Sequence, residues 1–262
     1  SLKAEKSFDF GLDLAASYAF TQSKSLCPAT SSQAASNWNN TSTYRFSNAP
    51  ELGYSAYNLP HMIKASAFYR FHIANNKNFT TTIGVIYQGR SGSPYSMLYS
   101  GDLNGDNGRG NDLMFIPTDE QIDLMPFKAQ GNYTEELQRQ NLKAWLAKTP
   151  YLKDHRGEYF KRNADNLPFE NHFDFHVAEK MSVKVGKQVH SLELSLDILN
   201  VGNLLNKDWG RTYGTIYSNE LISPLTYDGG KFQFLSTPDY VIKYPQSYYS
   251  RWRGQLGLKY TF

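Results

Sequence analysis

The last fifteen residues of the chain alternate between two kinds of side chain. From Tyr248 to Phe262, every second residue is aromatic, aliphatic or small, and the residues between them are mostly basic or polar. Such a period of two predicts a β-strand with one apolar and one polar face. Aromatic residues stand at both ends of the apolar face. This is typical of a strand that crosses an outer membrane in about 9–11 residues, between lipid and a polar lumen.

The same alternation recurs in five earlier segments. They span residues 8–20, 61–71, 79–88, 172–185 and 192–198. Short polar turns are expected at 74–78 and 186–188, and near residues 3–6 before the first strand. Long loops are expected at about 24–60, 99–170 and 203–247. We therefore predict an all-β chain, a transmembrane antiparallel β-barrel wall with short periplasmic turns and long extracellular loops.

Composition fits this class and excludes others. Mean hydropathy is negative, and no run approaches the ~20 apolar residues of a membrane helix. Tyr and Phe number 19 and 16, as aromatic belts require, and the net charge of +3 is scattered, which argues against a nucleic-acid partner. The single Cys27 excludes an internal disulfide. The chain opens without a signal peptide, so we expect a mature or truncated chain.

Six strands are too few to close a membrane barrel, since the smallest known have about eight. An open sheet edge would leave unpaired backbone groups in lipid, which is not tolerated. We therefore interpret residues 1–262 as the C-terminal part of a larger barrel.

Four motifs carry a resemblance to a known family. They are the strand exit from Gly89 to Ser96, the loop from Asp102 to Pro117, the segment from Asp197 to Asn206, and the closing strand. Together they resemble the TonB-dependent outer-membrane transporters. The second motif is similar to a loop in the branch with an N-terminal carboxypeptidase-regulatory-like domain.

The resemblance implies the last six strands of a barrel of about 22 strands with a plugged lumen. It implies active uptake of a bulky nutrient, such as a siderophore, glycan or peptide, driven by a TonB complex that contacts the plug. The plug is absent from this sequence. The implied partners are outer-membrane lipid, the remaining strands and plug, the barrel assembly machinery and a surface lipoprotein or other outer-membrane partner.

Two function classes stay open beside transport. One is a structural or adhesive outer-membrane barrel, and the other is a passive porin. No G-x-S-x-G elbow or comparable nucleophile motif occurs, so we predict that the chain is not an enzyme. No cofactor is expected to be required.

An Asp-rich loop is the one candidate metal site. Asp102, Asn104, Asp106 and Asp112 place oxygen ligands at calcium-loop spacing, which predicts Ca²⁺ in an extracellular loop. The pattern departs from a calcium loop at Asn107 and Leu113. The alternative is a loop whose side chains bond their own backbone. His172 and His176 would lie about 13 Å apart on a strand, too far for one metal.

Three further features carry expectations. Thr134 is a predicted N-cap of a helix that runs through Leu146. Tyr260 and Phe262 form a predicted assembly signal, because barrel assembly machinery could capture such a strand by strand addition. Loop aromatics could stack on sugar or peptide ligands; these are Trp38, Tyr44, Tyr54, Tyr57, Tyr213, Tyr217 and Tyr227.

Overall fold

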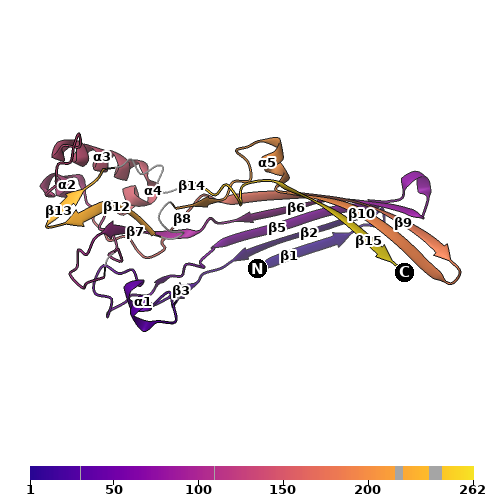
Figure 1. Ribbon diagram of the computed structural model, residues 1–262, viewed down its shortest axis with the longest axis horizontal. Coiled ribbons are helices and arrows are strands. Elements are labelled where there is room, and N and C mark those ends of the chain that lie inside the picture. Colours follow the sequence, from indigo (N-terminus) through magenta and orange to yellow (C-terminus); the bar gives the residue numbers. More distant parts are fainter. Residues whose placement is uncertain (30, 109, 216–220, 236–243) are drawn as a thin grey trace.

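A seven-stranded antiparallel sheet forms the long body of the molecule in the computed structural model (Figure 1). The structure describes residues 1–29, 31–108, 110–215, 221–235 and 244–262. The strands follow the order β1-β2-β5-β6-β9-β10-β15. Their bounds are Leu2–Ser7, Leu12–Phe20, His61–Phe71, Phe79–Arg90, Glu170–Val185, Gln188–Leu199 and Arg253–Thr261. The chain is mostly β, and the predicted antiparallel sheet of alternating strands is present; the chain is not all-β, because helices form in the long connections, and the sheet is not closed into a barrel.

The expectation of six strands was wrong by one. Residues 3–6, expected as a turn, belong to β1, which pairs with β2 from Leu2↔Tyr18 to Ser7↔Asp13. The turn lies at residues 8–11 instead, where Gly11 has φ +97° and any Cβ would meet the carbonyl oxygen of Arg70 at 2.1 Å. The short, charged sequence of β1 hid its alternation. The strand after this turn consequently begins at Leu12 rather than Phe8.

Cross-strand register keeps the two faces of the sheet separate. One row of partners is Leu12, Tyr69, Ile83, Val177, Leu196 and Leu256. The next row is Asp13, Phe68, Gly84, His176, Asp197 and Gln255. Successive residues of a strand point to opposite faces. The sheet therefore has one apolar face and one mostly polar face along its whole width.

Short and long connections alternate as predicted. Three short ones lie at one end of the sheet, the turn end; they are residues 8–11, 72–78 with the 3-10 helix η1 (Ile73–Asn75), and 186–187. The long ones gather at the other end, the loop end (Figure 1). The first contains β3 (Lys24–Ser25), α1 (Ala34–Asn39) and β4 (Gly53–Tyr54).

The two later long connections fold together into a cap, defined as residues 94–167 and 221–234. A four-stranded sheet orders β13-β12-β7-β8. Its strands are Lys231–Gln233, Leu221–Asp228, Pro94–Ser100 and Asp165–Asn166, and its helices α2, α3 and α4 are Asp119–Leu124, Glu135–Lys148 and Pro150–Asp154. In the last long connection, α5 (Val201–Leu205) and β11 (Tyr213–Gly214) precede β12, and β14 (Tyr244–Pro245), which pairs with β11, follows β13.

The cap has its own hydrophobic core, so the expectation of an irregular loop with one helix at 99–170 was wrong. Met97, Met114, Leu142, Leu146 and Phe160 are fully buried within it. The predicted N-cap is confirmed, since Thr134 Oγ1 accepts the N–H of Leu137 at 3.1 Å. β7 is buried on both faces and therefore shows no alternation in sequence.

Within the described residues, no helix combines the length and apolarity needed to cross a membrane.

Candidate functional site

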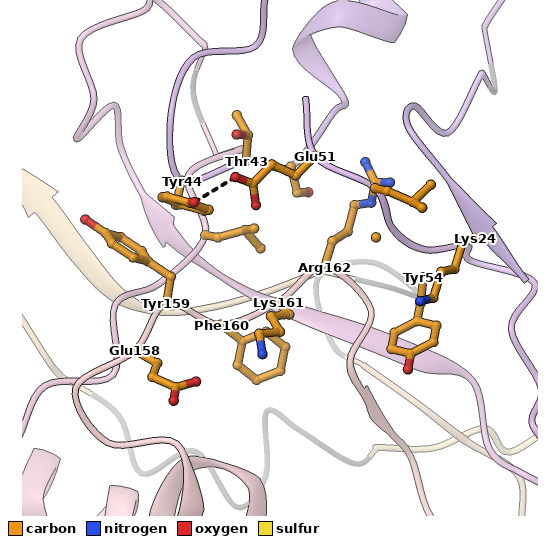
Figure 2. Close-up of a pocket in the computed structure, with 14 residues that line it drawn as sticks. Lys24, Thr43, Tyr44, Glu51, Tyr54, Glu158, Tyr159, Phe160, Lys161 and Arg162 are labelled. Carbon is orange, nitrogen blue, oxygen red and sulfur yellow. Dashed lines mark hydrogen bonds between the residues drawn. The ribbon is translucent and has the colours of Figure 1, made fainter. Parts of the chain in front are cut away.

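A cavity of about 470 Å³ lies at the loop end, between the first long connection and the cap. The first connection contributes Lys24 and residues 42–44 and 51–54, and the cap contributes Leu113 and residues 158–162. Figure 2 shows Tyr44 and Tyr159 together on one side, Lys24 and Tyr54 on the other, and Arg162 between them. Three cations, two carboxylates and four aromatic rings thus line one space.

The first wall consists of stacked rings. The Tyr44 and Tyr159 rings are 4.6 Å apart at 24°, and Phe115 meets Tyr159 edge-on at 5.1 Å. Tyr44 donates its hydroxyl hydrogen to Glu51 at 2.7 Å. This bond and partial burial beside the carboxylate raise the pKa of Tyr44, so its hydroxyl stays protonated and holds Glu51 at the cavity edge.

The opposite wall is the β3–β4 pair. Lys24 pairs with Tyr54, and the Lys24 ammonium lies 5.4 Å from the centre of the Tyr54 ring. Gly53 has a steric role here, because a Cβ would approach the Cβ and Nε of Arg162 to 2.9 Å. The glycine lets the arginine stem pass directly along the wall.

Arg162 is the central side chain and only 8% exposed. Its Nη1 donates to the carbonyl of Leu26 at 2.7 Å, and its Nη2 donates to the carbonyl of Ser25. Burial lowers the pKa of this guanidinium, but arginine remains charged in proteins. A positive charge is therefore held inside the cavity wall by main-chain carbonyls.

The cap positions Arg162 through its neighbour Asn163. Asn163 has φ +53°, a conformation that Asn tolerates better than most residues. Its N–H donates to Ser96 Oγ of β7 at 2.8 Å, and its amide donates to the Tyr54 carbonyl at 3.0 Å. The cap sheet and the β3–β4 wall are thereby tied at the base of the cavity.

The Asp-rich loop clamps the first connection to the cap. Asp106 accepts the N–H and the hydroxyl of Ser47, both at 3.1 Å. Thr43 pairs with Asp112 in an isolated parallel bridge, flanked by Thr43 N–H to Asn111 O and Leu113 N–H to Thr43 O, both 2.9 Å. Because residues 42–44 line the cavity, this clamp sets the position of the aromatic wall.

The carboxylates of this loop accept backbone N–H groups. Asp102 accepts from Gly105, Asp106 and Asn107. Asp112 accepts from Leu103 and Asn104. These bonds are those of the backbone-bonding alternative. In the described part of the chain, no three His, Cys, Asp or Glu residues are grouped so that they could hold a metal. The calcium ion stays a prediction.

Burial and hydrogen bonds act oppositely on two of these acids. Burial raises the pKa of Asp112, and the neighbouring Asp106 and Asp102 add to this. Burial also acts upward on Asp106, but hydrogen bonds from Gly108, Ser47 and Asn104 outweigh it and lower its pKa.

The other predicted residues lie apart from the cavity. His172 and His176 do not meet; His176 Nδ1 lies 2.6 Å from Asp197, and His172 Nε2 lies 3.2 Å from Thr212 Oγ1. Tyr260 lies on the apolar face, with its hydroxyl 2.6 Å from His190 Nδ1 and its ring 5.8 Å from that of Phe262.

Of the predicted loop aromatics that the structure describes, only Tyr44 and Tyr54 line the cavity. Trp38 bonds Asn48, Tyr57 is 77% exposed, Tyr213 packs near the cap core and Tyr227 contacts Phe232. Tyr217 lies outside the described residues. Sequence reasoning missed Glu51 and residues 158–162, whose role depends on non-local packing; the only local signal was the mixed charged and aromatic run from Glu158 to Arg162.

No family model matches this chain, and neither a curated protein nor a solved structure matches it.

Proposed function

We propose that this chain is part of the wall and ligand-capturing loops of an outer-membrane transporter of the TonB-dependent class. The observation that carries the proposal is the distribution of aromatic residues on the apolar face. Near the loop end stand Tyr18, Phe20, Tyr87 and Phe173; near the turn end stand Tyr69, Phe71, Phe79, Tyr260 and Phe262. Mostly aliphatic and small residues fill the band between these belts, as in membrane barrels, together with Phe175 and with Lys6 on the edge strand β1.

The dimensions of the sheet support a membrane location. β2 has nine residues and β5 eleven, which at ~3.3 Å per residue span about 30–36 Å. The band is open to its surroundings, with Leu256 and Leu258 77% and 72% exposed. Such a continuous apolar surface is unfavourable in water, and lipid would cover it.

The edges of the sheet support a larger barrel. β1 and β15 each have a partner on one side only among the described strands. Further strands on these edges would satisfy the free backbone groups, as lipid cannot. In this proposal the cap faces outside and the turns face the periplasm, and barrel assembly machinery recognises the strand that carries Tyr260 and Phe262. The proposed partners also include a plug, a TonB complex and a surface lipoprotein.

Topology is tested by cysteine labelling of intact cells. Replacing Cys27 by Ser gives a background to which Tyr57→Cys, at the loop end, or Lys187→Cys, at the turn end, is added. A membrane-impermeant maleimide should label the first variant in intact cells and the second only after the outer membrane is permeabilised. Equal labelling of both variants in intact cells would refute the outer-membrane location.

A second measurement separates transport from the porin and the structural or adhesive barrel. The complete barrel, purified with its remaining strands and plug, should show no large resting conductance in planar bilayers, because a plugged lumen blocks ions. Uptake by cells should stop when the proton-motive force is collapsed. A large open conductance would favour a porin, and surface protein without energy-dependent uptake would favour a structural barrel.

A further inference from the structure

Arg162 has a charge that the described residues do not neutralise. Six other arginines there pair with a carboxylate; they are Arg45, Arg70, Arg90, Arg139, Arg156 and Arg211. Arg162 is the arginine that is buried, yet its partners are two main-chain carbonyls. A buried charge without a counter-charge is costly. The cavity beside it is where an anion could supply that charge.

The other charged groups of the cavity leave room for an anion. Lys24 and Lys161 line it together with Arg162, and Glu51 and Glu158 oppose them. Glu51 is already engaged, by the Tyr44 hydroxyl at 2.7 Å and by Arg45 Nε at 3.7 Å. The positive groups of the lining therefore exceed the free negative ones.

Planar aromatic rings make up much of the uncharged part of the cavity lining. Tyr44 and Tyr159 present a stacked pair, and Tyr54 and Phe160 present further rings (Figure 2). Aromatic faces pack against other rings, whether a sugar or an aromatic group. A volume of about 470 Å³ lies within the range of small-molecule sites, about 300–1,000 Å³.

We propose that this cavity binds a six-membered ring bearing a carboxylate, with the carboxylate on Arg162 and the ring against the tyrosines. A guanidinium has five N–H donors in a planar fork that matches a carboxylate, and two of its nitrogens already hold Arg162 in place through the carbonyls of Ser25 and Leu26. Uronic-acid sugars and aromatic acids both have this chemistry. The inference rests on the proposed function, since it names the class of nutrient that the loops would capture.

Isothermal titration of the purified protein in detergent micelles tests the proposal with matched probes. Galacturonate is compared with galactose, and benzoate with benzyl alcohol, so that each pair differs in the carboxylate. The acid of at least one pair should bind about tenfold more tightly than its neutral counterpart. The pair that shows the preference identifies the source of the ring.

Variants assign the preference to Arg162. Arg162→Gln should abolish it, Arg162→Lys should retain part of it, and Lys153→Gln, on α4 outside the cavity, should leave it unchanged. If Arg162→Gln does not fold, the comparison of acid and neutral probes on the parent protein decides alone. Equal binding of acid and neutral probes, no binding of either acid, or a preference that survives in folded Arg162→Gln would overturn the proposal.

Failure of this inference is distinguishable from failure of the proposed function. The cysteine-labelling experiment reports which end of the sheet faces outward and uses no ligand. Correct topology without a carboxylate preference would overturn only the ligand class.

Discussion

The cap buries its large apolar side chains, whereas the sheet leaves many of its large apolar side chains exposed. In the cap, Met97, Leu142 and Phe160 are completely buried by residues of the cap itself. In the sheet, Leu256, Leu258 and Phe262 are 77%, 72% and 81% exposed, although their strand is fully paired to β10 along its length. The cap therefore has a core of its own, whereas the described residues leave the apolar face of the sheet uncovered.

The largest expected effect separates the cap from the sheet. Leu142→Ala removes a side chain that is 0% exposed in the cap core, so it should lower the free energy of unfolding of the cap by about 2–5 kcal/mol. Hydrogen exchange should accelerate in α3 and β7 and stay unchanged in β5 and β6. Leu137→Ala, on the same helix but 38% exposed, is the control. Equal acceleration in the sheet would show that the two regions unfold together.

The next effect distinguishes the two faces of the sheet. Val85 and Ile86 are adjacent, 42% and 39% exposed, and lie on opposite faces of β6. Val85→Arg would place a charge in the proposed lipid band and should cost about 2–4 kcal/mol of folding free energy in the membrane. Ile86→Arg points to the polar face, opposite Asp174, and should cost little.

Folding into vesicles, followed by urea titration, measures this pair. A large loss for Val85→Arg and a small one for Ile86→Arg supports a lipid-covered face. Similar losses of folding free energy for both variants would contradict the assignment of one face of the sheet to lipid and the other to a polar lumen.

A smaller effect is expected at the start of α3. Thr134→Ala removes the side-chain oxygen that accepts the Leu137 N–H, which should destabilise the cap by about 1 kcal/mol. Thr134→Ser retains the hydroxyl and should restore most of that stability. Urea unfolding of the three proteins, monitored by exchange in α3, gives the measurement; full stability of Thr134→Ala would show that the helix terminus contributes nothing.

The smallest expected effect concerns the clamp between the first connection and the cap. Burial raises the pKa of Asp112, so its folded pKa lies above its unfolded value near ~4. A carboxyl of this kind favours folding below the unfolded pKa, and that contribution is lost as pH rises through the folded pKa. In EDTA at pH 7, Asp112→Asn should therefore raise cap stability by up to about 1 kcal/mol.

The stability difference between Asp112→Asn and the parent protein should depend on pH and on calcium. The advantage of Asp112→Asn should disappear as the pH falls below about 4, where both forms are uncharged. A bound calcium ion would reverse the sign: calcium would stabilise the parent protein and not the variant. Thermal melts in EDTA and in calcium, at both pH values, decide between the backbone-bonding loop and the metal site.

The sheet was predictable because its information is local. The period of two predicted six of its strands, and the predicted 61–71 coincides with β5. The predicted closing strand, 248–262, is longer than the observed Arg253–Thr261. β1 was missed because Lys6 lies on the apolar face, where it pairs with Leu14 and weakens the pattern. The alternation of short and long connections followed from the same strands.

The cap and the cavity were not predictable in this way. β7 is buried on both faces, and its partner β12 runs parallel to it from more than a hundred residues along the chain. Thr134 was found because an N-cap is a local signal, and Tyr44 and Tyr54 were singled out only as loop aromatics. The mixed run from Glu158 to Arg162 did not indicate that Arg162 is buried, because its burial depends on Ser25, Leu26 and Gly53.

The sequence by itself determined which side of each strand is apolar, because side chains alternate along any extended backbone whatever it pairs with. It also determined the capped helix and the backbone-bonding capacity of the Asp-rich loop. Only the tertiary structure decided that two distant connections share one core and that Arg162 is buried beside stacked tyrosines. Those features arise from contacts between segments far apart in the chain, and no local period encodes such contacts.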